Sequence, residues 1–227
     1  MQLAKPRFDV GLFTNRLEPM LAFYQGELGL SFDHMLPLGR GLRQHRHDVN
    51  GSVLKINHAR DPLPVAAPAG WRELLIARPG IAVPEQLHDP DGNAVTLVPP
   101  GHHGITGIAI RLAAREPDWH RDFLGRILAL PAQGEDGFRL GDGVILLEKD
   151  AAAAVDLAMD AKGFRYITIQ VIKVDTEHAA ILARGGREGR APQTLGSTAR
   201  ISFVRDPDGN WIEISQRASL TGSLDQG

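Results

Sequence analysis

The sequence predicts an α+β fold of tandem βαβββ units, arranged in two halves of which the N-terminal one is shortened. The main observation is an internal repeat, because Asp-Pro-Asp-Gly-Asn occurs at residues 89–93 and again at residues 206–210. An alternating apolar run follows each copy, at residues 94–98 and 211–215. Proline presets φ, aspartate can hydrogen-bond its own backbone, and glycine takes the positive φ that other residues resist. Each copy therefore predicts a hairpin corner between two strands.

The first unit has the order strand, helix and three strands. Residues 7–14 alternate as a strand, and Asn15 can cap a helix that extends through residue 28. Further strands are predicted for residues 30–38 and 42–58. The second of these runs is turned at Asn50-Gly51, which is a strong hairpin dipeptide.

The second unit lacks its helix. A Pro- and Ala-rich linker at residues 61–70 precedes a strand at residues 71–77. Arg78-Pro79-Gly80 then leads directly to the strands around the first corner motif. The unit is followed by Pro99-Pro100-Gly101, where neither proline can donate a ladder hydrogen bond. This tripeptide is the predicted boundary between two domains.

The pattern restarts after this boundary. The third unit is predicted as a strand at residues 105–112, a helix at 116–130, and strands at 138–140 and 144–148. The fourth is complete, with a strand at 164–174, a helix at 176–184 and strands that end near residue 215. We therefore predict a shortened N-terminal domain at residues 1–100, a complete C-terminal domain at 101–217 and a disordered tail at 218–227.

The composition limits the classes of function. The 227 residues are 43% apolar, which is enough for a buried core, and the formal net charge of −2 gives no basic footprint for nucleic acid. No cysteine is present, so disulfides and thiolate chemistry are excluded. The N-terminus lacks the apolar core of a signal peptide and no apolar run approaches a membrane span, so we expect a cytoplasmic protein with no membrane partner.

The four units resemble the vicinal oxygen chelate superfamily, which groups glyoxalases, bleomycin- and fosfomycin-resistance proteins and extradiol dioxygenases. The resemblance rests on the Asp-Pro-Asp-Gly-Asn corners and on helix ends of the type found at residues 23–29. It implies two half-open mixed-sheet barrels, each curved around a concavity that holds a metal or a ligand. Many members complete their barrels by dimerisation, so exposed edges of the second unit could pair in a homodimer.

The resemblance also implies where a metal would be held. Members that use a metal take ligands, typically His and Glu, from the first and last strands of each unit. Here no such position holds a histidine, and only Glu213, in its Trp-Ile-Glu-Ile-Ser context, matches. We favour a pocket carboxylate over a ligand to Fe, Mn, Zn or Ni, although that alternative stays open. The matching positions hold Asp9, Lys55, Glu73, Thr96, Gly107, Leu146 with Glu148 one pleat further, Tyr166 and Glu213.

A second metal alternative involves His45 and His47. They lie two apart on a predicted strand, so their side chains share one face. If that face is concave, they could join Asp9 and Glu73 in a histidine–carboxylate site. We favour a solvated strand face, because Lys55 would add a cation to the same cavity. The stretch is also basic and could instead bind a substrate carboxylate through Arg40, Arg43 and Arg46.

The predicted function is that of a small-molecule enzyme, a lyase or dioxygenase of this superfamily, acting on an oxygenated and aromatic metabolite. Glu213 is the candidate base, and Tyr166 is the candidate acid or oxyanion donor. The alternative is a metal-free protein that binds a drug or metabolite, which the missing histidines favour. The predicted substrate-binding residues are Arg111, Gln170, Glu148, Asp9, Lys55 and Glu73.

Overall fold

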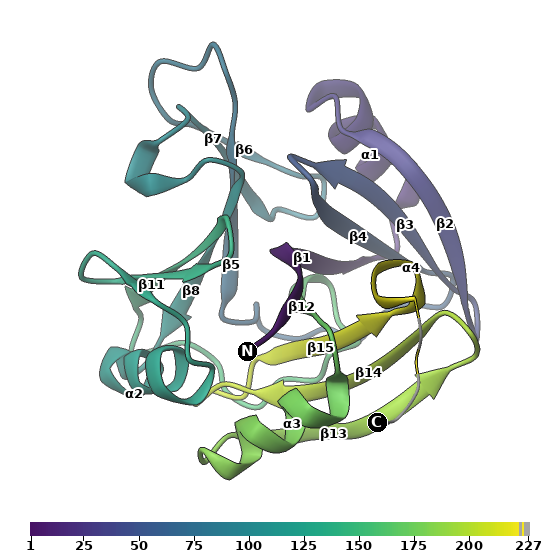
Figure 1. Ribbon diagram of the computed structural model, residues 1–227. Coiled ribbons are helices and arrows are strands. Elements are labelled where there is room, and N and C mark those ends of the chain that lie inside the picture. The colour runs from purple at the N-terminus through teal and green to yellow at the C-terminus, as the bar shows by residue number, and fades with distance from the viewer. Residues whose placement is uncertain (223, 225–227) are drawn as a thin grey trace.

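The computed structural model describes residues 1–222 and residue 224, and it has an α+β architecture of two mixed sheets (Figure 1). The first unit comprises β1 (Leu3–Thr14), α1 (Leu17–Leu21), η1 (Ala22–Glu27), β2 (Ser31–Gly39), β3 (Leu42–Val49) and β4 (Ser52–Ala59). The second comprises β5 (Trp71–Ala77), β6 (Glu85–His88) and β7 (Ala94–Val98), and η2 (His102–Gly104) follows it.

The second half repeats the order of the first unit twice. The third unit comprises β8 (Ile108–Ala114), α2 (Pro117–Asp122), η3 (Phe123–Ile127), β9 (Ala132–Gln133), β10 (Gly137–Leu140) and β11 (Gly143–Lys149). The fourth comprises β12 (Gly163–Val171), α3 (Val174–Ala183), β13 (Arg187–Leu195), β14 (Ala199–Arg205) and β15 (Trp211–Arg217), followed by α4 (Ala218–Thr221). The α+β class and the tandem βαβββ units are therefore confirmed, and no helix lies between β5 and β6 in the described chain.

The units pair differently from the predicted division at residue 100. The eight-stranded sheet has the order β13-β14-β15-β12-β1-β4-β3-β2, so it joins the first unit to the fourth. The seven-stranded sheet has the order β6-β7-β5-β8-β11-β10-β9 and joins the second unit to the third. Figure 1 shows this pairing directly, with the purple β1 beside the green β12. The two sheets therefore do not correspond to one barrel formed by residues 1–100 and a second formed by residues 101–217.

The physical reason lies in the first strand of each unit. β1 pairs with β12 and β5 pairs with β8, both antiparallel, so each sheet forms where two first strands meet at their free edges. The predicted boundary at residues 99–101 lies between two units of one sheet. The chain instead passes between sheets in the linker at residues 61–70 and in the loop at residues 150–162.

One apolar core joins both sheets and the helices. It contains Val10 and Leu12 from β1, Trp71 from β5 and Ile167 from β12, all at most 2% exposed. Each sheet therefore buries one face in a shared core, and its other face is left to form a concavity.

The two corner motifs are hairpin corners, and each is fastened to a helix. Asp89 Oδ1 accepts hydrogen bonds from the backbone N–H groups of Asp91 and Asn93, both at 2.9 Å. Asp89 Oδ2 accepts one from the Tyr24 hydroxyl at 2.9 Å. The glycines at positions 92 and 209 have φ of 87° and 80°, the positive values that the repeat predicts.

The second corner repeats this arrangement with a charged partner. His120, from α2, lies with Nε2 3.3 Å from Asp206 Oδ2, and both side chains are fully buried. Burial alone lowers the pKa of His120, but the carboxylate of Asp206 raises it above its ordinary value. Tyr24 and His120 thus tie the helix of one sheet to a corner of the other sheet.

The prediction of a disordered tail is wrong for its first residues. Ala218–Thr221 forms the short helix α4, and the Ala218 N–H donates to the Thr198 carbonyl oxygen. Residues 223 and 225–227 of the predicted tail lie outside the described part of the chain. Within residues 1–222 and 224, no helix has the length and apolar character needed to cross a membrane.

The Tyr24–Asp89 hydrogen bond makes a testable contribution to stability. Replacing Tyr24 by phenylalanine leaves a buried carboxylate oxygen short of one donor, which we expect to reduce the free energy of unfolding by about 1–3 kcal/mol. Urea unfolding of the wild type and of Tyr24→Phe measures this difference. Equal midpoints in the two proteins would contradict the assignment.

Candidate functional site

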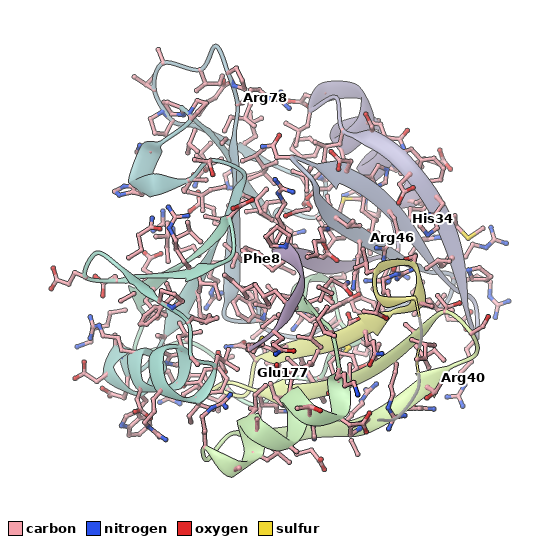
Figure 2. The ribbon with its side chains drawn as sticks, viewed as in Figure 1. Phe8, His34, Arg40, Arg46, Arg78 and Glu177 are labelled. Carbon is pink, nitrogen blue, oxygen red and sulfur yellow. The ribbon has the colours of Figure 1, made fainter. Side chains whose placement is uncertain are left out.

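The concave face of the eight-stranded sheet contains a cavity of about 580 Å³. Its floor is polar and is formed by β4, β12 and β15, whereas its walls carry apolar side chains such as Phe13, Leu42 and Phe203. Figure 2 labels two arginines on this side, with Arg46 in the interior and Arg40 at the periphery. The volume lies in the range of sites for small molecules.

The alternation of each strand decides which side chains reach this face. Val10, Ile167 and Ile212 point into the core, so their neighbours in sequence point into the concavity. On β1, Val10 and Leu12 face the core in this way. The inward-facing residues are Asp9, Gly11 and Phe13 on β1, Lys55 and Asn57 on β4, Tyr166, Thr168 and Gln170 on β12, and Glu213 and Ser215 on β15.

Lys55 and Glu213 form the central ion pair of the site. Lys55 Nζ lies 2.7 Å from Glu213 Oε2 and 2.6 Å from Thr168 Oγ1, and the Thr168 hydroxyl donates to the same Glu213 oxygen at 2.5 Å. Burial lowers the pKa of Lys55, although Glu213 and Asp9 oppose this effect. Glu213 Oε1 has no hydrogen-bond partner among the described residues, so one carboxylate oxygen is anchored and the other is free to meet a ligand.

Tyr166 lies in the same cavity with its proton unused. Its hydroxyl oxygen accepts hydrogen bonds from Asn57 Nδ2 at 3.2 Å and from Gln44 Nε2 at 3.4 Å. Burial, reinforced by the charge of Glu213, raises the pKa of Tyr166 well above its usual value, so the group stays a phenol at neutral pH. It can therefore donate its proton to an oxygen atom of a ligand.

Asp9 is a buried carboxylate whose oxygens are occupied. It lies 2.8 Å from Lys5 Nζ and accepts hydrogen bonds from the Val53 N–H and from Gln170 Nε2 at 2.9 and 3.0 Å. Burial alone raises the pKa of Asp9, but Lys55 and Lys5 outweigh it and the pKa falls below its ordinary value. Asp9 and Gln170 thus lie on the same face of the sheet, joined by this hydrogen bond, and neither belongs to the residues that line the cavity.

The predicted substrate-binding residues fall into two groups on different sheets. Glu73, Arg111 and Glu148 lie together on the seven-stranded sheet, where Arg111 Nε is 2.6 Å from Glu73 Oε2 and 3.5 Å from Glu148 Oε2. Glu73 also accepts hydrogen bonds from the Gln86 amide and the Thr96 hydroxyl. Arg111 borders a separate cavity of about 650 Å³, and its charge is already paired.

His45 and His47 lie on the opposite face from the site. On β3 it is Gln44 and Arg46 that face the concavity, so the two histidines point toward Phe32 and the helix η1. His47 is fully buried there, with Nε2 2.8 Å from Gln25 Nε2. The predicted alternative of a metal site with Asp9 and Glu73 is therefore wrong. The solvated face that we favoured is wrong for His47, whereas His45 is half-buried. Within the described chain no three His, Cys, Asp or Glu side chains come together as metal ligands.

Sequence reasoning missed several members of the floor. Thr168, Asn57 and Gln44 hold the catalytic candidates in place, and Ser215 and Arg217 line the cavity. The available signal was alternation, because Thr168 and Asn57 each lie two residues from a predicted inward position. The side of β3 that faces the cavity could not be predicted in this way, because polar residues lie on both sides of that strand.

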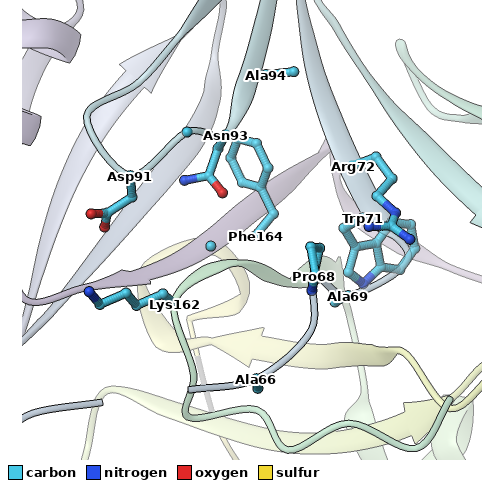
Figure 3. Close-up of a pocket in the computed structure, with 12 residues that line it drawn as sticks. Ala66, Pro68, Ala69, Trp71, Arg72, Asp91, Asn93, Ala94, Lys162 and Phe164 are labelled. Atoms are coloured by element: carbon cyan, nitrogen blue, oxygen red, sulfur yellow. The ribbon is translucent and has the colours of Figure 1, made fainter. Parts of the chain in front are cut away.

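A third cavity, of about 320 Å³, lies where the linker at residues 61–70 passes the first corner motif (Figure 3). Trp71, Phe164 and Lys162 border it together with Asp91 and Asn93. Asn93 donates to Asp89 within the corner, and Asp91 lies 4.0 Å from Arg16. The polar groups of this cavity therefore serve the turn, so it is a weaker candidate than the eight-stranded concavity.

Gly11 provides a test of the site's packing. A Cβ at this position would overlap the Tyr166 ring, so Gly11→Ala must displace the phenol from Asn57 and Gln44. We expect a loss of about 1–3 kcal/mol in unfolding free energy from this overpacking. Gly107→Ala is the matched control, since its Cβ would meet nothing closer than 3.8 Å. Equal urea midpoints for the two variants would show that the ring is not confined by Gly11.

His47 makes the stability depend on pH. Burial, with a smaller effect of His45, lowers the pKa of His47 to about 4. The unfolded chain then binds this proton more readily, so stability is full above about pH 6.5 and decreases as the pH falls toward 4. We expect the stability difference between wild type and His47→Gln to shrink by up to about 3 kcal/mol between pH 7 and pH 4. A pH-independent difference in urea unfolding would contradict this.

Comparisons with known proteins agree with this architecture. A glyoxalase I mutant from Zea mays superposes with a TM-score of 0.74 at 13% identity, covering 99% of this chain and 96% of that one. Glyoxalase I from Zea mays gives 0.70 at 13% identity with 92% of each chain covered, and the cppA protein of Streptococcus pneumoniae TIGR4 gives 0.58 at 9%, with 95% and 98% covered. No curated protein sequence matches. The sequence profile of one family matches residues 8–214, and the chain therefore belongs to the Glyoxalase/Bleomycin resistance protein/Dioxygenase superfamily.

Proposed function

We propose that this protein is an enzyme that moves a proton next to a carbonyl group of a small oxygenated, aromatic metabolite. The observation that carries the proposal is the placement of the Lys55–Glu213 pair and the Tyr166 hydroxyl on one cavity floor. The reaction takes place in the concavity of the eight-stranded sheet, and the protein is a cytoplasmic one.

Glu213 serves as the base. Its Oε2 is held by Lys55 and Thr168, which leaves Oε1 to take a proton from the carbon beside the carbonyl. The electron pair of that C–H bond forms a C=C bond, and the carbonyl oxygen takes up negative charge. Where the deprotonated carbon carries a hydroxyl group, the proton of that hydroxyl passes to the former carbonyl oxygen, and Glu213 returns its own proton to the former carbonyl carbon. This completes the isomerisation of an α-hydroxycarbonyl compound with no other reactant.

Tyr166 and Lys55 stabilise the developing oxyanion. The phenol keeps its proton because burial raises its pKa, and its oxygen is fixed by two amide donors. The Lys55 ammonium adds a positive charge 5.3 Å from the centre of the Tyr166 ring. Donors that are fixed in place before the reaction are effective in a water-poor site.

The residues on this floor do not fit the divalent metal that the family implies. Glu213 supplies one carboxylate, and the inward-facing residues around it include Asp9, which is bound to Lys5, together with Thr168 and Lys55. The Lys55 ammonium, which is paired with Glu213, repels a second cation. This donor set favours proton transfer over the dioxygen chemistry named in the family description, because dioxygen chemistry needs a redox metal.

The second candidate function is that of a metal-free protein that sequesters a metabolite or drug. The observation that favours it is the degree to which the polar floor is satisfied internally, since Asn57, Gln44 and Thr168 all have protein partners. A binding protein of this kind would be stabilised by its ligand without converting it.

Substitution of Glu213 tests the enzymatic proposal. We expect Glu213→Gln to reduce kcat/KM for any converted carbonyl compound by at least about 10²-fold, because the amide cannot accept the proton. α-Hydroxycarbonyl compounds, catechols, hemithioacetals and related oxygenated metabolites are assayed with and without added Fe²⁺, Mn²⁺, Zn²⁺ or Ni²⁺. Glu85→Gln, an exposed change on β6, is the control.

Three results would separate the alternatives. Unchanged turnover in Glu213→Gln would remove the proposed base. Turnover that depends on an added metal would contradict the role given to Lys55. Thermal stabilisation by a ligand that is never converted would favour the binding protein.

A further inference from the structure

The buried charges of the eight-stranded concavity do not balance. Asp9 pairs with Lys5, and Glu213 pairs with Lys55. Two further cations, Arg46 and Arg217, lie close enough to each other for their charges to interact. Neither forms an ion pair with a carboxylate among the described residues. The floor therefore carries an excess of positive charge.

Arg46 is the more deeply buried of the two cations. Its residue is only 4% exposed, and it lies on β3 directly opposite Lys55 of β4. Nη1 donates to the neutral Gln44 amide oxygen at 2.8 Å, whereas Nε is buried without an acceptor. A buried guanidinium with so few acceptors is unfavourable unless an anion joins it.

Arg217 lies at the end of β15, where α4 begins, and it lines the cavity together with Ser215 and Gln44. No hydrogen bond from its side chain is found within the described chain. Burial lowers the pKa of Arg217 and the positive charge of Arg46 contributes to the same effect, whereas the carboxylates of Glu213, Asp9 and Asp33 oppose it.

We propose that Arg46 and Arg217 form a subsite for an anionic group, a carboxylate or a phosphate, on the small molecule that enters this cavity. The inference rests on the proposed function, because it names the class of ligand for the same cavity. Arg217 would contact the anion, together with the Ser215 hydroxyl. Arg46, which is bonded to the Gln44 side chain and does not line the cavity, would attract the anion through its positive charge. Guanidinium groups are well suited to both anions because they offer paired N–H donors.

The apolar walls specify the rest of the ligand. Phe13, Leu42 and Phe203 face the same space as Arg217, and Arg190 lies over the Phe203 ring at 5.4 Å at the rim. A molecule with an anionic end against Arg217 and a planar apolar body against these rings would use both surfaces. The ligand is therefore an amphipathic anion rather than a neutral oxygenated compound.

Binding of simple probes tests this assignment. Isothermal titration calorimetry of the full-length protein compares phenylacetate and phenyl phosphate with neutral phenylacetamide. We expect at least one anion to bind about 10-fold or more tightly than the amide, which corresponds to about 1.4 kcal/mol. Tighter binding of phenyl phosphate, with competition by inorganic phosphate, identifies a phosphate; tighter binding of phenylacetate identifies a carboxylate.

Variants assign the preference to the two arginines. Arg217→Gln should reduce anion affinity about 10-fold while amide binding is unchanged, and Arg126→Gln, an exposed change on η3, should alter neither. Arg46→Met should also remove the anion preference without lowering the thermal midpoint of the unliganded protein, because it removes an unpaired buried charge. A merely structural arginine would lower that midpoint.

The outcomes that overturn the subsite differ from those that overturn the enzyme. Equal affinity of wild type for the anions and the amide, no binding of either anion, or unchanged binding in Arg217→Gln would each refute the subsite. If Glu213→Gln still abolished turnover, the proposed reaction would stand. Arginine-dependent anion binding without any turnover would refute the enzyme and leave the subsite intact.

Discussion

The antiparallel pairing of β1 with β12 is the constraint on which the site depends. It sets Asp9 opposite Thr168 and Gly11 opposite Tyr166, and it brings the first and fourth units into one sheet. Because side chains alternate along a strand, a slip of one residue would turn Tyr166 into the core and Ile167 into the cavity. The absence of a side chain at Gly11 leaves the space in which the phenol ring lies.

The polar floor and the apolar core have separate tasks. Lys55, Glu213 and Asp9 are buried charges, and taking them out of water is compensated only in part by their pairing. The stability of the fold comes from the common apolar core and from the two corner motifs that join the sheets through Tyr24 and His120. The sheet can therefore hold a fixed, partly unsatisfied set of charges on its concave face.

The units and much of the site could be predicted from local patterns. The repeated corner predicted the hairpins, and the resemblance to the family, applied strand by strand, indicated Lys55, Tyr166 and Glu213 as inward-facing residues. The pairing of units could not be predicted, because every unit offers a similar free edge on its first strand. The face of β3 was ambiguous because polar residues occupy both of its sides, and His45 and His47 therefore fell on the wrong one. The tail sequence is polar, yet α4 forms because it packs on β15 and β1.

The cavity takes one wall from β1 to β4, at the start of the chain, and the other from β12 to β15, at its end. While the ribosome is still translating the middle units, β1 has emerged but its hydrogen-bonding edge has no partner. An unpaired strand edge is a template for pairing with another chain. A polypeptide that ends before β12 lacks one wall of this cavity, whereas the residues that line the cavity beside Arg111 are already present.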